Sequence, residues 1–82
     1  MTLKELANLL LELSEKYPTH TVLENNGDYI HNLPIDGIAK VREYTAVQYE
    51  DGDINYELPS SAGYPNGPAK SDAIVIDFSH KY

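Results

Sequence analysis

The sequence predicts an α+β fold in which one N-terminal helix packs on an antiparallel sheet of four to five strands. Three observations carry this prediction. Leucines recur at helical spacing near the N-terminus, the apolar pattern changes to a period of two after Pro18, and a run of β-branched residues lies near the C-terminus. With 82 residues and no internal repeat, the chain is expected to form one domain, residues 1–82.

A helix is expected over residues 2–17. Thr2 and Glu5 have the spacing of a capping box, in which each side chain accepts a hydrogen bond from the other residue's backbone. Pro18 disfavours helical backbone at Tyr17 and ends the helix there. A stripe at intervals of three and four residues predicts that a sheet or a second subunit covers the helix. It comprises Leu3, Leu6, Ala7, Leu10, Leu13 and Tyr17, and it is widened by Leu9 and Leu11.

Two hairpins are expected to follow. The first spans about residues 21–32, with a two-residue turn at Asn26-Gly27 that pairs Leu23 with Ile30. Residues 33–37 are expected to be an irregular link. The second hairpin spans about residues 41–58 and turns at Asp51-Gly52, a dipeptide favoured in type I′ turns.

A two-residue turn in the second hairpin sets Glu50 directly against Asp53 and separates two faces. The predicted apolar face holds Thr45, Val47, Tyr49, Ile54, Tyr56 and Leu58. The predicted acidic face holds Ala46, Gln48, Glu50, Asp53, Asn55 and Glu57. A shift of one residue would mix the faces.

A long loop, residues 59–71, and a last strand, residues 72–78, complete the prediction. Pro65 and Asn66 suit positions i+1 and i+2 of a type I or type II turn. The loop superficially resembles a phosphate-binding loop, but its glycine spacing differs, and Pro65 and Pro68 remove backbone N–H groups that a phosphate would need. The last strand is apolar on both faces, which predicts a central position in the sheet.

The acidic composition limits the classes of partner. There are 13 Asp and Glu against 6 Lys and Arg, for a formal net charge of −7. Nucleic acid and anionic membranes attract basic surfaces, so neither is expected as a direct partner. The absence of cysteine, of a secretory signal and of a long apolar run favours a soluble protein of the cytoplasm. The acidic surface either serves solubility alone or faces a basic protein.

No motif has the spacing that chemistry requires. Residues 51–55 begin like a calcium loop, but Tyr56 and Ala62 stand where glycine and glutamate are needed. The three histidines lack metal-ligand spacing, no serine lies in a nucleophile elbow, and a chain this short leaves little room for a walled cleft. We therefore expect a protein that is not an enzyme, without catalytic, cofactor-binding or metal-binding residues. A weak surface cation at the second hairpin is the alternative.

Most of the chain resembles a class of short proteins found in phages, prophages and mobile elements. The shared pattern lies in core and turn positions: Leu3, Leu6, Leu10, Tyr17-Pro18, Val22, Glu24, Asn26-Gly27, Ile35, Gly37-Ile38, Val41 and the terminal Ala73 to Ile76. The resemblance implies a small accessory protein that binds and inhibits a component of the host cytoplasm, such as a defence protein.

The leading functional hypothesis is an acidic protein-binding module that occupies a basic surface of a host protein. Glu50, Asp51, Asp53 and Glu57 would supply charge, and Tyr64 with Asn66 would supply an anchor on the loop. One alternative is a homo-oligomer that self-associates through its leucine helix and sequesters a small molecule. Another is a structural accessory protein without a discrete site, whose acidic residues only keep an edge strand from pairing.

Overall fold

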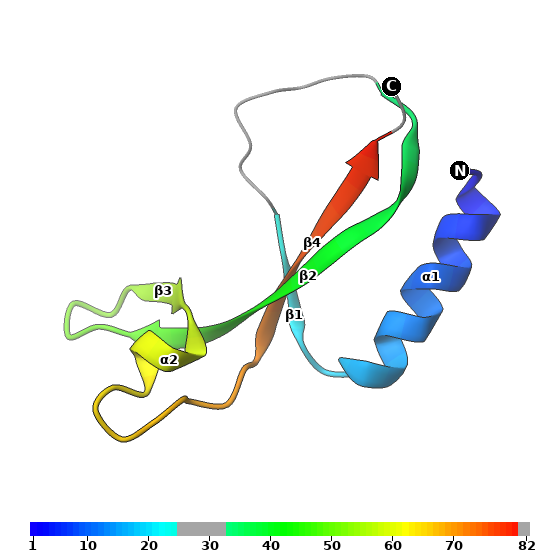
Figure 1. The fold of residues 1–82 in the computed structure, drawn as a ribbon. Coiled ribbons are helices and arrows are strands. Elements are labelled where there is room, and N and C mark those ends of the chain that lie inside the picture. The colour runs from blue at the N-terminus through cyan, green and yellow to red at the C-terminus, as the bar shows by residue number, and fades with distance from the viewer. Residues whose placement is uncertain (25–32, 81–82) are drawn as a thin grey trace.

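The computed structural model describes residues 1–24 and 33–80, which form one long helix, a mixed sheet and a second, short helix (Figure 1). The elements are α1 (Leu3–Lys16), β1 (Thr21–Leu23), β2 (Ile35–Gln48), β3 (Ile54–Glu57), α2 (Pro59–Ala62) and β4 (Ala73–His80). The sheet has four strands in the order β1-β4-β2-β3. This confirms the predicted α+β class.

The sheet is mixed, whereas the sequence predicted an antiparallel one. β1 pairs in parallel with β4, and β2 pairs in antiparallel fashion with both β4 and β3. β1 therefore finds its partner at the far end of the sequence. The turn and return strand of the predicted first hairpin, Asn26-Gly27 and Ile30, lie outside the described residues.

Helix α1 begins and ends where the sequence predicts. The backbone N–H of Glu5 donates to Thr2 Oγ1 at 3.2 Å, and the N–H of Thr2 donates to Glu5 Oε1 at 2.9 Å. This bond from the Thr2 backbone lowers the pKa of the Glu5 carboxyl. At the other end Tyr17, the residue before Pro18, donates its N–H to the Leu13 carbonyl at 2.8 Å. The capping box and the proline thus fix both ends.

The leucines of α1 divide between two sides of the helix. Leu6, Leu9 and Leu13 are half-buried together with Tyr17, whereas Leu3, Leu10 and Leu11 are exposed. No residue of α1 is buried. The predicted stripe is wider than the surface that one sheet covers, and the helix turns only part of it inward.

β4 is the central strand, as its apolar sequence predicts. Its first three residues, Ala73, Ile74 and Val75, are the buried apolar residues of the described chain. Thr45, the buried polar residue, lies next to them on β2 and donates its hydroxyl to the Lys70 carbonyl at 3.1 Å. β4 also extends to His80, beyond the predicted end at residue 78.

β2 is longer than the sequence predicts, and the irregular link expected at residues 33–37 is wrong from residue 35 onward, where β2 has begun. Ile35 and Gly37 pair with His80 and Ser79 on β4. The pairing shifts register between Ile35 and Gly37 and between Ile38 and Lys40. Such irregularities bend a strand without ending it, so a segment with a mixed apolar pattern still continues the sheet.

Asp72 joins three strands where β4 begins. Its N–H donates to the Tyr44 carbonyl on β2, and its carbonyl accepts from Thr21 on β1, each at 3.0 Å. Its side-chain Oδ1 accepts from the N–H of Ala46 at 2.9 Å. The carboxylate thus takes the bond that a further residue of β4 would have made. One residue fixes the positions of β1 and β2 relative to β4.

The buried segment of β4 generates a stability prediction. Val75 is 5% exposed on β4, and Val22 is 65% exposed on β1. Val75→Ala removes two buried methyl groups and leaves a cavity, so it should lower the free energy of unfolding by about 2 kcal/mol. Val22→Ala makes the same chemical change in solvent and should cost under about 0.5 kcal/mol. Urea unfolding followed by circular dichroism measures both, and equal losses would contradict the assigned core.

Candidate functional site

The turn between β2 and β3 differs from the predicted two-residue turn. The N–H of Gly52 donates to the Tyr49 carbonyl at 2.9 Å, and the N–H of Tyr49 donates to the Asp53 carbonyl at 2.8 Å. Gly52 has φ +91°, which favours glycine. Glu50, Asp51 and Gly52 therefore form a three-residue loop, a type I turn followed by a glycine bulge.

The extra loop residue shifts the pairing by one position, so the predicted register is wrong. Gln48 pairs with Ile54, Val47 with Asn55, Ala46 with Tyr56 and Thr45 with Glu57. A one-residue shift moves every side chain of one strand to the other face. Glu50 and Asp53 consequently lie in and beside the loop instead of opposite each other, and the predicted acidic face does not form.

Glu57 is engaged within the hairpin. Its carboxylate accepts a hydrogen bond from the Tyr49 hydroxyl, and the residue is half-buried. This hydrogen bond is the main reason that the pKa of Tyr49 is raised above its usual value. The carboxylates left in solvent are those of Glu50, Asp51 and Asp53, of which Asp51 also accepts from the Asp53 N–H at 3.0 Å.

The predicted loop at residues 59–71 contains the short helix α2, which the sequence analysis missed. Pro59 at its first position is a recognised start signal. The Pro59 carbonyl accepts from the N–H groups of Gly63 and Ala69, at 3.1 and 2.8 Å, so the loop closes on its own helix. A Cβ at Gly63 would lie 1.8 Å from the Gly67 carbonyl oxygen. The backbone at Gly63 is therefore packed against the returning chain.

Tyr64 and Asn66 lie in the turn that leaves α2. The N–H of Asn66 donates to the Gly63 carbonyl at 2.8 Å, and the Tyr64–Pro65 peptide bond is cis. This places Pro65 at position i+2 of a type VI turn, so the predicted type I or II turn is wrong. Both side chains are in solvent, and Tyr64 is 83% exposed.

These segments form one end of the molecule, remote from α1 in Figure 1. We call this region the tip surface. It comprises the carboxylates of Glu50, Asp51 and Asp53 and the exposed apolar or aromatic side chains of Tyr49, Ile54, Tyr56, Leu58 and Tyr64, of which Tyr49 lies on one face of the hairpin and Ile54 and Tyr56 lie on the other. β3 forms the edge of the described sheet. Of the six residues predicted to bind protein, Glu50, Asp51, Asp53 and Tyr64 lie on this surface, and Asn66 lies in the turn that holds Tyr64. The sixth, Glu57, accepts a hydrogen bond from Tyr49 within the hairpin.

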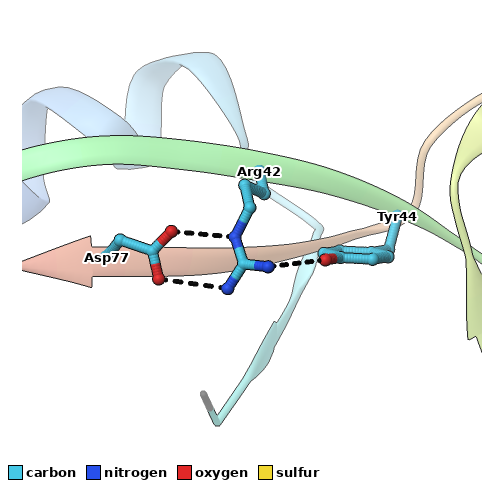
Figure 2. A network of polar contacts seen from close by, with 3 residues as sticks. All are labelled: Arg42, Tyr44 and Asp77. Atoms are coloured by element: carbon cyan, nitrogen blue, oxygen red, sulfur yellow. Dashed lines mark hydrogen bonds and ion pairs between the residues drawn. The ribbon is translucent and has the colours of Figure 1, made fainter. Parts of the chain in front are cut away.

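A second polar cluster joins β2 to β4 (Figure 2). Arg42 donates from Nε and Nη2 to the two Asp77 carboxylate oxygens, at 2.8 and 3.1 Å, and from Nη1 to the Tyr44 hydroxyl at 2.9 Å. The hydrogen bond to Asp77 raises the pKa of the Arg42 guanidinium. The cluster lies in front of the two strands, and α1 lies behind them. Each of the three Arg42 nitrogens donates a hydrogen bond within the cluster, and the bidentate pair with Asp77 holds the two strands together.

A third cluster was not foreseen, and nothing in the spacing of its residues signals it. Ser71 donates its hydroxyl to Glu43 Oε1 at 2.9 Å, and His20 Nε2 lies 3.0 Å from the same hydroxyl. In a nucleophilic triad the histidine lies between serine and carboxylate. Here the serine lies between them, and its proton points to the carboxylate. The arrangement fastens the α1–β1 connection to β2.

Three further findings concern the class of protein and not the geometry of these clusters. Within residues 1–24 and 33–80, no three or more His, Asp or Glu side chains gather where they could hold a metal ion. In the same residues no helix has the length and apolar character to cross a membrane. No protein-family model, curated protein or solved structure matches the chain.

The closed loop generates a prediction about Gly63. Besides the Gly67 oxygen, its Cβ would meet the backbone nitrogen of Ala69 at 2.6 Å, so Gly63→Ala must displace the loop. We expect a loss of about 2 kcal/mol in the free energy of unfolding. Gly37→Ala is the matched control, because its Cβ meets only Ser79 Oγ at an ordinary 3.5 Å. Equal urea midpoints for the two variants would disprove the close packing.

The Tyr49–Glu57 contact generates a pH prediction. Glu57→Gln should lower the Tyr49 pKa, measured by NMR titration of the labelled ring, and Glu50→Gln, the same charge change without that hydrogen bond, should leave most of the shift. Because folding raises this pKa, the stabilisation is complete below the unfolded value near 10.0 and is lost as pH rises through the folded value. A Tyr49 pKa that is insensitive to Glu57→Gln would contradict the contact.

Proposed function

We propose that the chain is a non-enzymatic protein-binding module that docks a basic protein surface through its tip surface. The observation that carries the proposal is the exposure of aromatic and aliphatic side chains around an acidic turn at the edge of the sheet. Several exposed apolar side chains close to charged groups are typical of interaction sites. Tyrosine is a favoured anchor because it buries a large area with few rotatable bonds.

Charge favours a basic partner over other proteins. From residue 43 to residue 69 the chain carries five acidic residues and no Lys or Arg. Three of these acids, Glu50, Asp51 and Asp53, lie in or beside the exposed turn. Carboxylates at the rim of an interface mainly raise the association rate and select against acidic partners.

The backbone supports the same role. α2 and the loop that closes on it hold Tyr64 on a short, hydrogen-bonded scaffold instead of a free linker. Such pre-organisation reduces the entropy lost on binding. The resemblance of the sequence to phage and prophage accessory proteins supports a host protein as the target, with inhibition, for example of a defence component, as the result.

The proposal is tested by affinity capture from host lysate, followed by binding kinetics with the captured partner. The acid variant Glu50→Gln, Asp51→Asn, Asp53→Asn should reduce the association rate about tenfold at low salt, and less at moderate salt. The charge-matched control Glu12→Gln, Glu24→Gln, Asp36→Asn changes three exposed acids away from the tip and should keep the wild-type rate.

The aromatic anchor is tested on the same partner. Tyr64→Ala should weaken binding about 30-fold, as expected for an anchor worth about 2 kcal/mol. Val22→Ala, which changes an exposed apolar residue on β1, should have no effect.

Equal losses of association rate in the acid variant and its control would show that only net charge matters. Unchanged binding of both the acid variant and Tyr64→Ala would sink the proposal.

A further inference from the structure

Apart from Val22 on β1, the exposed large apolar side chains of the described residues fall into two groups. One belongs to the tip surface. The other lies along or just before α1 and comprises Met1, Leu3, Leu10 and Leu11, of which Leu3 is 82% and Leu11 65% exposed. With the exposed Ala7, the residues at positions 3, 7 and 10 follow the alternating four-and-three spacing of a helix–helix seam. We call Leu3, Ala7, Leu10 and Leu11 the outer seam of α1.

The chain exposes more surface than its mass requires. Its accessible area is 6589 Å², whereas a folded monomer of 9.2 kDa exposes about 4,900 Å². Full exposure of the ten residues outside the described ranges would account for about 1,000 Å² of this surplus. About 700 Å² then remains, to which the exposed apolar side chains of both groups contribute.

The radius of gyration points the same way. It is 15.1 Å, with principal extents of 43 × 30 × 20 Å, and a compact domain of this length has about 12 Å. Three buried apolar residues make a small core for the described chain. A domain of this size without disulfides commonly gains stability by oligomerisation.

We propose that the outer seam of α1 is a homodimer interface, in which two copies of α1 pack antiparallel about a twofold axis. The charges beside the seam fit this orientation. Lys4 and Glu15 lie eleven residues apart, about three turns, on one side of the helix, and both are exposed. Antiparallel packing sets Lys4 of one copy beside Glu15 of the other, twice. Parallel packing would leave Lys4 and Glu15 about three turns apart along the dimer, so neither charge would gain this partner.

Antiparallel packing of the two α1 helices also fixes where Leu10, Leu11 and Leu3 lie across the interface. Leu10 lies near the twofold axis, and Leu11 of one copy meets Ala7 of the other. The two Leu3 residues lie about 20 Å apart along the paired helices. Since the tip surface is at the other end of the molecule (Figure 1), both tips stay open in the dimer. Two linked tips bind a repeated or dimeric partner more tightly than one.

Sedimentation equilibrium over a range of concentrations tests the dimer. The wild-type chain should have twice its 9.2 kDa mass. The double variant Leu3→Gln, Leu11→Gln should lose the dimer, and Val22→Gln should keep it, because Val22 is as exposed as Leu11 but lies on β1. A monomeric wild type, or equal loss in Val22→Gln, would overturn the proposal. So would a monomer whose outer seam binds lipid vesicles instead.

Single cysteines test the orientation and do not depend on the stability of the double variant. The sequence has no cysteine, so each variant carries one thiol. Under mild oxidation Leu10→Cys should form a disulfide-linked dimer on a non-reducing gel, and Leu3→Cys should not. Equal cross-linking of both variants would indicate parallel helices and overturn the antiparallel arrangement. Cross-linking of neither would overturn the interface.

Discussion

The fold depends on strand β4, which pairs with β1 on one side and β2 on the other and supplies the buried residues Ala73, Ile74 and Val75. Its position is fixed by Asp72, whose backbone and carboxylate bind both neighbouring strands where β4 begins. The Arg42–Asp77 pair adds a bidentate clamp between β2 and β4 on the face away from α1. The tip surface and the outer side of α1 are attached to this centre and are exposed to solvent.

Local chemistry made much of this fold predictable. The capping box at Thr2 and Glu5 and the stop before Pro18 define α1 without reference to the rest of the chain. The central position of β4 follows from a strand that is apolar on both faces. Each of these signals depends on neighbours in the sequence or on the composition of one segment, so tertiary contacts had little opportunity to override them.

The wrong predictions concern segments for which two local conformations differ little in energy, or whose partner strand is distant in the sequence. Asp51-Gly52 suits a two-residue turn, but Gly52 suits the bulge of a three-residue loop equally well. The three-residue loop pairs Glu57 with Thr45 instead of Ala46. The parallel partner of β1 and the grouping of His20, Ser71 and Glu43 depend on chain crossings that no pattern within one segment encodes. The exposure of Tyr64 was foreseeable, because the loop around it is polar and rich in proline and glycine.

The parallel pairing of β1 with β4 also governs the order in which the chain can fold. His20 and Ser71, at the start of this pairing, are 51 positions apart in sequence. Closing so long a loop costs entropy before any contact repays it, so such topologies fold slowly compared with local hairpins. During synthesis the β2–β3 hairpin can form as soon as it emerges, whereas β1 must wait for β4, with which it pairs. Until then the leucines of α1 have no strand to cover them, and the newly made chain is at its most vulnerable to aggregation and proteolysis.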